Sequence, residues 1–248
     1  MPSELFPAFI KLENRRCLVV GAGAIATSKI ASLLRAGAHI TVVAPQAKSE
    51  VAKLAAAGNI TWHQREFRLD DLRDIFLAIA ATGSASVNRE VFLAAQARGI
   101  LTNAVDDPPH CDFYFPAVVR RGDLQIAIST AGESPSVAQR FRREIEASLD
   151  LSLGNWLRFI GSLRRHVLAH HPPTEERKKL LNLLAYSQIC DSKDCKIESR
   201  SIEFAGRHVH LPEHLPEDPP EDRPKDRPAD RLVKPSTIDS PSAMQEQP

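Results

Sequence analysis

The stretch Cys17-Leu18-Val19-Val20-Gly21-Ala22-Gly23-Ala24-Ile25-Ala26 runs from a short apolar segment through two glycines into a helical pattern that lasts to Gly37. The order of strand, glycine turn and helix is typical of a loop that cradles nucleotide phosphates. Gly21 suits backbone angles that a side chain would hinder, and Gly23 allows close approach of a pyrophosphate. The first helical amides would then face the phosphates. The stretch therefore favours nucleotide binding over a turn that binds nothing.

Strand-like and helix-like segments alternate up to about residue 150. Apolar strand-like runs occupy residues 17–20, 40–43, 60–63, 76–80, 101–105 and 124–129, and helical patterns occupy 24–36, 49–57, 86–98 and 135–149. This alternation favours an α/β fold with a doubly wound parallel sheet. Ser134 and Pro135 suit the cap and first turn of the last of these helices. From 151 to 186 the pattern is wholly helical, with Pro172-Pro173 separating two helices.

Composition bounds the class of protein. The chain has 248 residues, 43% of them hydrophobic, and a net charge of +1, which suits one to two globular domains and gives no overall electrostatic case for a nucleic-acid or membrane partner. No apolar stretch approaches the roughly 20 residues of a membrane helix, and the N-terminus does not read as a secretory signal, so we expect a cytoplasmic protein. The four cysteines are too scattered for a disulfide framework, and we expect reduced thiols. Residues 205–248 are rich in Pro and charge, and we expect them to be disordered.

The end of the second expected strand lacks a usual cofactor contact. Most dinucleotide-binding domains place Asp or Glu there to hold the ribose hydroxyls, whereas here Val43 leads to Ala44-Pro45-Gln46. Pro45 and Gln46 are therefore the candidate ribose contacts. Lys48 lies nearby and would suit a phosphorylated ribose. NAD is therefore the expected cofactor, with NADP as the alternative.

Two later strands also end in polar residues at the edge where open sheets bind ligands. Thr82 follows the strand-like run 76–80, and we expect it to contact the ribose or nicotinamide side of the cofactor, the alternative being a cap for the next helix. Asp106 and Asp107 follow the run 101–105. Adjacent carboxylates suit proton transfer, although an Asp-Pro turn initiator explains them equally well.

The segments 6–12, 79–82, 103–108, 113–116 and 126–135, together with the Gly21-Ala22-Gly23 turn, resemble the precorrin-2 dehydrogenase/sirohydrochlorin ferrochelatase family, the N-terminal portion of siroheme synthase. The phrase Ser129-Thr130-Ala131-Gly132-Glu133-Ser134-Pro135 is the most selective part of this likeness. The resemblance implies NAD-dependent oxidation of precorrin-2 to sirohydrochlorin in siroheme biosynthesis. It also implies ferrochelation with ferrous iron in some members, although the sequence offers no dedicated metal site. The alternatives are a non-catalytic nucleotide-sensing module and a dehydrogenase of another small acid.

The resemblance also implies domains and site residues. It implies a Rossmann-type NAD-binding domain over 1–112, a dimerisation and substrate segment over 113–150 and a helical domain over 151–204, with the chain forming a homodimer. Asp106 corresponds to the proposed catalytic residue. The expected cofactor contacts are Gly21, Gly23, Ala24, Ile25, Pro45, Gln46 and Thr82, and the expected substrate contacts are Asn103, Ser129, Thr130 and Arg142.

Overall fold

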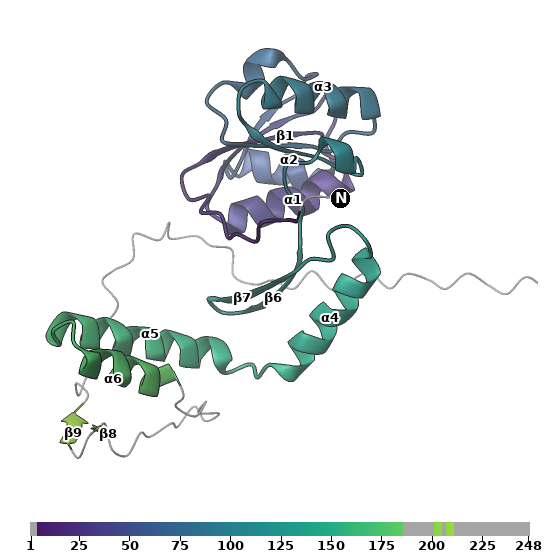
Figure 1. Ribbon diagram of the computed structural model, residues 1–248. Coiled ribbons are helices and arrows are strands. Elements are labelled where there is room, and N and C mark those ends of the chain that lie inside the picture. Colours follow the sequence, from purple (N-terminus) through teal and green to yellow (C-terminus); the bar gives the residue numbers. More distant parts are fainter. Residues whose placement is uncertain (1–3, 186–200, 205–206, 211–248) are drawn as a thin grey trace, which may run out of the picture. The chain divides into compact units, whose positions relative to one another are not determined.

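A parallel sheet of five strands forms the centre of the first part of the chain (Figure 1). The computed structural model describes residues 4–185, 201–204 and 207–210. The strands lie in the order β3 (Thr61–His63), β2 (His39–Val43), β1 (Arg16–Val20), β4 (Leu77–Ala80) and β5 (Leu101–Ala104). All four neighbouring pairs are parallel, and the strand order reverses between β1 and β4. The predicted doubly wound sheet is confirmed, and ligands bind such sheets at the carboxyl ends near the reversal.

Alternate side chains of β1 enter two different hydrophobic cores. Cys17 and Val19 pack in a core with α1 (Ala24–Arg35) and α2 (Ser49–Ala56), whereas Leu18 and Val20 pack in a core with α3 (Ala85–Gln96). In Figure 1, α3 accordingly lies on the opposite side of β1 from α1 and α2. Burying one such Val or Leu side chain contributes about 1.5–3 kcal/mol, so the centre of the sheet is firmly held. The packing of β1 in both cores fixes its carboxyl end, where the glycine turn begins.

The strand-like run 124–129 does not join the parallel sheet, and that expectation is wrong. It forms β7 (Leu124–Ile128), which pairs antiparallel with β6 (Ala117–Arg121) in a separate two-stranded sheet. Sequence reasoning missed β6. The two strands are joined by a two-residue turn, Gly122-Asp123, with Gly122 at a φ of +57°. A turn this short permits only a hairpin, because a parallel crossover needs a much longer connection.

Helix α4 (Pro135–Ser148) begins as the sequence predicts. The Ser134 hydroxyl accepts a hydrogen bond from the backbone N–H of Val137 at 3.3 Å, and Pro135 occupies the first turn. The far end of α4 is tied to the hairpin by Arg121, whose guanidinium donates to the backbone carbonyls of Glu146 and Leu149. The hairpin and α4 therefore form one connected piece.

The chain divides into two compact units, residues 1–151 and 152–248. In the second unit, α5 (Leu153–His170) and α6 (Glu175–Ala185) share a core of Leu163, Val167, Leu180 and Leu184. The Pro172-Pro173 pair lies between the two helices, as expected. A hairpin of β8 (Ser201–Phe204) and β9 (Arg207–His210) follows, and the rest of the expected disordered segment 205–248 lies outside the described residues. None of the helices in the described part of the chain is long and apolar enough to span a membrane.

Candidate functional site

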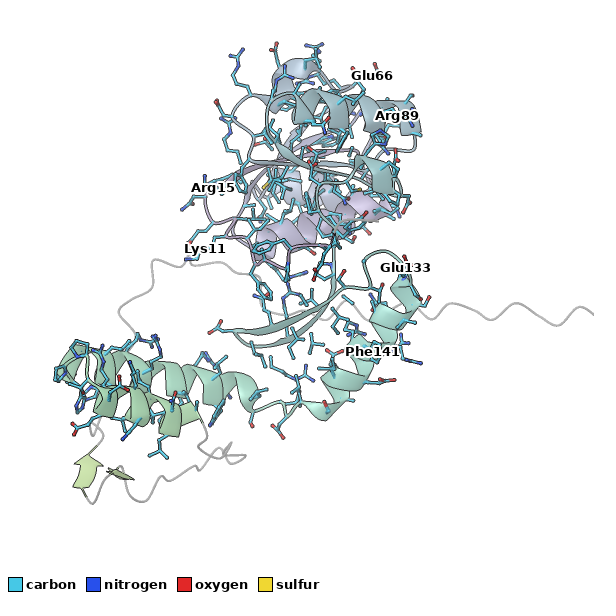
Figure 2. All side chains as sticks on the ribbon, viewed as in Figure 1. Lys11, Arg15, Glu66, Arg89, Glu133 and Phe141 are labelled. Carbon is cyan, nitrogen blue, oxygen red and sulfur yellow. The ribbon has the colours of Figure 1, made fainter. Side chains whose placement is uncertain are left out.

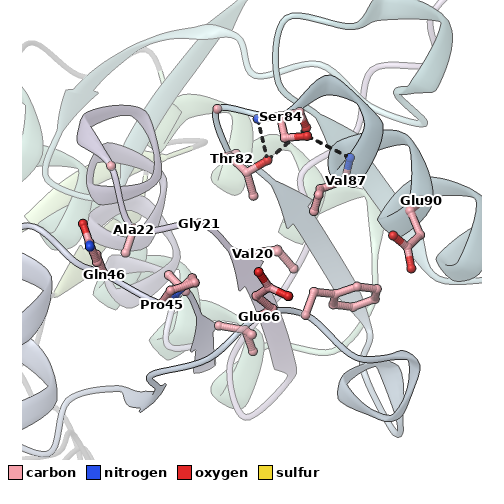
Figure 3. Close-up of a pocket in the computed structure, with 16 residues that line it drawn as sticks. Val20, Gly21, Ala22, Pro45, Gln46, Glu66, Thr82, Ser84, Val87 and Glu90 are labelled. Carbon is pink, nitrogen blue, oxygen red and sulfur yellow. Dashed lines mark hydrogen bonds between the residues drawn. The ribbon is translucent and has the colours of Figure 1, made fainter.

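A pocket of about 550 Å³ opens at the carboxyl ends of the central strands (Figure 3). Its lining comes from the turns after β1, β2 and β4, the segment after β3 and the first half of α3. Five of the predicted cofactor contacts line it: Gly21, Gly23, Pro45, Gln46 and Thr82. The other two, Ala24 and Ile25, begin α1 directly after the lining residue Gly23. The pocket lies where open α/β sheets bind nucleotides.

The two glycines have different structural requirements. Gly21 has a φ of +105°, and a Cβ built on it would lie 2.3 Å from the carbonyl oxygen of Ala81, so only glycine fits there. Its N–H donates to the Val43 carbonyl at 2.9 Å, which joins the turn to β2. A Cβ on Gly23 would meet nothing within 4 Å, and Gly23 provides no side-chain cap for α1. The open space in front of uncapped helical amides fits the pyrophosphate of a dinucleotide.

Thr82 is held in place by a buried asparagine. The Thr82 hydroxyl donates to Oδ1 of Asn88 at 2.6 Å, and the Thr82 N–H donates to the same oxygen at 3.0 Å. Asn88 is only 5% exposed and returns a bond from Nδ2 to the Thr82 carbonyl at 3.3 Å. The cap of α3 is Ser84, whose hydroxyl accepts from Val87, so Thr82 is not the cap. Sequence reasoning missed Asn88, although an asparagine on the apolar face of a helix was a visible signal.

We expect Asn88→Ala to lower the free energy of unfolding by about 1–3 kcal/mol, because it leaves the Thr82 N–H without its acceptor. It should also weaken dinucleotide binding, since Thr82 lines the pocket. Urea denaturation and calorimetric titration with NAD measure the two effects. Arg89→Ala is the matched control on the exposed side of the same helix (Figure 2) and should change stability by no more than about 0.5 kcal/mol. Equal stability of the two variants would contradict this role of Asn88.

Asp106 lies in a tight turn directly after β5. Val105 donates to the Ala80 carbonyl at 2.9 Å, and Asp107 donates to the Ala104 carbonyl at 3.2 Å, which closes the turn. Asp106 is exposed and has a φ of +61°. Ala80 at the end of β4 pairs with Ala104 at the end of β5. Thr82 and Asp106 therefore each lie two residues beyond the end of their strand. The catalytic candidate therefore stands beside the turn that lines the pocket, although Asp106 is not itself a lining residue.

The second carboxylate has a different partner. Asp107 Oδ2 lies 2.8 Å from Nδ1 of His110, and the ring of His110 packs edge-on against Phe92 with centroids 5.1 Å apart. Asp107 also starts the short helical turn Pro108–His110, whose last N–H donates to the Asp107 carbonyl. The turn-initiator interpretation thus describes Asp107 and leaves Asp106 available for another role.

Lys29, which sequence reasoning did not place in the site, lies within the electrostatic reach of Asp106. Lys29 Nζ of α1 lies 3.6 Å from the centroid of the Phe115 ring. Burial lowers the pKa of the Lys29 ammonium, and the negative charge of Asp106 opposes that change. Helix α1 therefore brings a cation into the electrostatic field of the Asp106 carboxylate.

Asn103, an expected substrate contact, is 7% exposed and already bonded. Its Nδ2 donates to the Phe113 carbonyl at 2.8 Å and to the Cys111 sulfur at 3.2 Å. Burial raises the pKa of the Cys111 thiol, which donates in turn to the Ala104 carbonyl. Cys17 and Cys111 are free thiols, whereas Cys190 and Cys195 lie outside the described residues. The contacts of Asn103 hold the segment that carries Phe113 and Phe115 against the sheet.

The remaining expected substrate contacts lie around the start of α4. The Ser129 hydroxyl accepts from the Ala131 N–H at 3.1 Å, and the Thr130 hydroxyl exchanges bonds with the backbone of Ser134 at 3.1 and 3.2 Å. Arg142 donates to Gln139 at 3.0 Å and pairs with Glu146. None of the four expected substrate contacts lines the pocket. Their substrate role stays a prediction.

The pocket lining contains two acidic residues that sequence reasoning missed, Glu66 and Glu90. It contains no Lys, Arg or His. Among the residues that the structure describes, no group of three or more His, Cys, Asp or Glu side chains could hold a metal ion. The described site thus consists of a glycine-bounded pocket with two carboxylates, and of Asp106 on the neighbouring turn.

Two family models match consecutive parts of this chain. A model for NAD(P) binding matches residues 8–117, and the model of the sirohaem biosynthesis protein central region matches residues 121–148. The siroheme synthase of Photorhabdus laumondii is 43% identical over 164 residues, which cover 66% of this chain and 35% of that protein. The siroheme synthase of Neisseria meningitidis serogroup C is 41% identical over 174 residues, covering 70% of this chain and 36% of that protein.

A solved structure is similar over nearly its whole length. The match to SirC, precorrin-2 dehydrogenase, has 28% identity and a TM-score of 0.66, and covers 75% of this chain and 92% of that chain. The likeness thus continues past the nucleotide-binding part. The chain belongs to the precorrin-2 dehydrogenase/sirohydrochlorin ferrochelatase family. It spans only about a third of the curated siroheme synthases that it matches.

Membership of the precorrin-2 dehydrogenase family agrees with the order of elements. The NAD(P)-binding model ends at residue 117, where β6 begins, and the central model covers the end of β6, β7 and α4. The β6–β7 hairpin and α4 are therefore the central region of this family.

Proposed function

We propose that this protein catalyses the NAD-dependent oxidation of precorrin-2 to sirohydrochlorin. The observation that carries the proposal is the position of Asp106, on the turn beside the glycine-bounded pocket, in a chain of the precorrin-2 dehydrogenase family. A pocket alone would suit a nucleotide-sensing module. A carboxylate beside it adds a group that can take a proton during hydride transfer.

Residues of the pocket bind the cofactor, and Asp106 beside the pocket takes part in the reaction. Gly21, Gly23 and the first amides of α1 would hold the pyrophosphate of a bound dinucleotide, and Pro45 and Gln46 would contact the ribose of its adenosine half. Thr82, which Asn88 holds in place at the end of β4, would contact the cofactor from that side of the pocket. Bound NAD supplies the hydride acceptor. Asp106 accepts the proton that accompanies loss of hydride from a ring carbon, so that no charge accumulates on the macrocycle.

Carboxylates of the substrate require cations and hydrogen-bond donors. We assign this role to Ser129, Thr130 and Arg142, with Asn103 supporting the segment between the sheet and β6. Arginine suits carboxylates because its planar donors match two oxygens at once. Arg142 now pairs with Glu146, so substrate binding by Arg142 requires exchange of that partner.

The direct test is to mix the purified protein with precorrin-2 and NAD and to follow the absorbance of NADH and of the oxidised macrocycle. We expect the two signals to appear together and in equal amounts. Binding of NAD without oxidation would favour the sensing module, and oxidation only of a small hydroxy acid would favour another dehydrogenase. Adding ferrous iron to the same reaction tests whether this chain also inserts iron as a substrate.

We further propose a homodimer in the cytoplasm. Apolar side chains that are exposed in the single chain support the dimer: Phe6 is 89% exposed, Phe9 is 70% exposed and Phe141 on α4 is 41% exposed (Figure 2). Large exposed apolar surfaces commonly mark interaction sites.

A further inference from the structure

The adenosine side of the pocket lacks the carboxylate that dinucleotide-binding folds usually place at the end of the second strand. Strand β2 ends at Val43 and continues into Ala44, Pro45 and Gln46. We infer that Glu66 supplies this carboxylate from the neighbouring strand and makes the pocket select NAD over NADP. The inference rests on the proposed NAD-dependent function, which it deepens.

The strand register carries the inference. Val43 of β2 pairs with His63 of β3, so Gln46 and Glu66 each follow their strands by three residues. The pairing extends one step beyond the strands, because the Ala44 N–H donates to the His63 carbonyl at 3.2 Å. The indole N–H of Trp62 donates to the Ala44 carbonyl at 3.0 Å and fixes the same end of β2. Glu66 therefore enters the pocket beside the segment where the ribose contact is expected.

The backbone around Glu66 is braced. Arg65 donates to the Glu66 carbonyl at 2.9 Å and makes two bonds to the Asp71 carboxylate, at 2.8 and 2.6 Å. Asp71 also accepts from the Arg68 N–H at 2.8 Å, which closes the turn after Glu66. The side chain of Glu66 is itself exposed and has no hydrogen bond or ion pair within the described part of the chain. The Glu66 carboxylate is thus carried on a fixed backbone and is free to accept a hydrogen bond from a ligand.

Charge on the lining favours an unphosphorylated ribose. In Figure 3 the Glu66 carboxylate lies in the middle of the lining, with Pro45 and Gln46 on one side and Glu90 on the other. The lining residues carry two carboxylates and no cation, and Lys48 is not one of them. Ribose hydroxyls donate to a carboxylate, whereas a 2′-phosphate brings like charge against it. Glu66 is the acidic lining residue that the register aligns with the ribose segment, while Glu90 comes from α3.

The test is calorimetric titration of the full chain with NAD and with NADP, without tetrapyrrole. We expect the wild type to bind NAD more tightly than NADP. Glu66→Gln should weaken NAD binding about tenfold and so reduce the ratio of NAD affinity to NADP affinity. Glu66→Lys should bind NADP more tightly than the wild type does. Glu90→Gln is the matched variant from the same pocket and should change the preference less than Glu66→Gln. Thermal unfolding confirms that the variants remain folded, as expected for exposed side chains.

An unchanged NAD/NADP ratio in both Glu66 variants, with normal NAD binding by the wild type, would overturn this inference and leave the proposed function standing. An equal change in Glu90→Gln would also overturn it, because the selectivity would then come from the summed charge of the pocket. Failure of the wild type to bind either dinucleotide would overturn the proposed function, and this inference with it.

Discussion

Asp106→Asn is expected to reduce the turnover of precorrin-2 by about 10²–10⁴-fold, the range that a general base contributes. The amide has the shape of the carboxylate but cannot take up the proton released as hydride leaves. Asn also tolerates the left-handed conformation at position 106, where φ is +61°, so the turn should persist. Single-turnover absorbance measurements at saturating NAD isolate the oxidation step, and calorimetry should give an NAD affinity close to that of the wild type.

Asp107→Asn is the matched control. It removes a charge from the adjacent position and weakens the contact with His110, but it leaves Asp106 intact. We expect it to retain most of the turnover. Full activity in Asp106→Asn, or an equal loss in both variants, would remove Asp106 from the role of proton acceptor.

The sequence predicts the parallel sheet because its signals, an apolar run followed by a glycine turn and a helical pattern, lie in neighbouring residues. The run from Cys17 to Val20 is at most 2% exposed, and the glycines after it sit where the chain turns into α1. The cap at Ser134 was likewise readable, since a hydroxyl before a proline-started helix is a local signal. Such features depend on residues only a few positions apart, so one sequence suffices to find them.

The features that the sequence did not reveal depend on distant pairs. Glu66 reaches the pocket only because β2 and β3 pair in a particular register, and Lys29 meets Phe115 only once α1 packs on the sheet. The strand-like run at Leu124 pairs in the β6–β7 hairpin and not in the parallel sheet that the sequence predicts for it, because an apolar run does not identify its pairing partner. The pairing of Arg142 with Glu146 is an exception, because the two residues are four positions apart on one helix and their pairing is a local feature.

Gly21→Ala is expected to lower the free energy of unfolding by about 2–5 kcal/mol and to abolish dinucleotide binding. The added methyl group would lie 2.3 Å from the backbone oxygen of Ala81, and the backbone would be held at a φ of +105°, which alanine disfavours. Neither strain can relax locally, because the Gly21 N–H is bonded to Val43 and the Ala81 N–H is bonded to Val20. Urea denaturation measures the loss of stability, and calorimetry with NAD measures the loss of binding.

Gly23→Ala separates the two effects, because a methyl group there meets no protein atom within 4 Å and the φ of −80° is ordinary for alanine. We therefore expect its stability to stay within about 0.5 kcal/mol of the wild type. Its NAD affinity should still fall at least about tenfold, because the methyl group occupies the space through which the backbone approaches the pyrophosphate. A stable Gly23→Ala protein that binds NAD normally would show that the pyrophosphate does not lie on this turn. Gly23→Ala therefore tests dinucleotide binding alone, whereas Gly21→Ala tests stability and dinucleotide binding together.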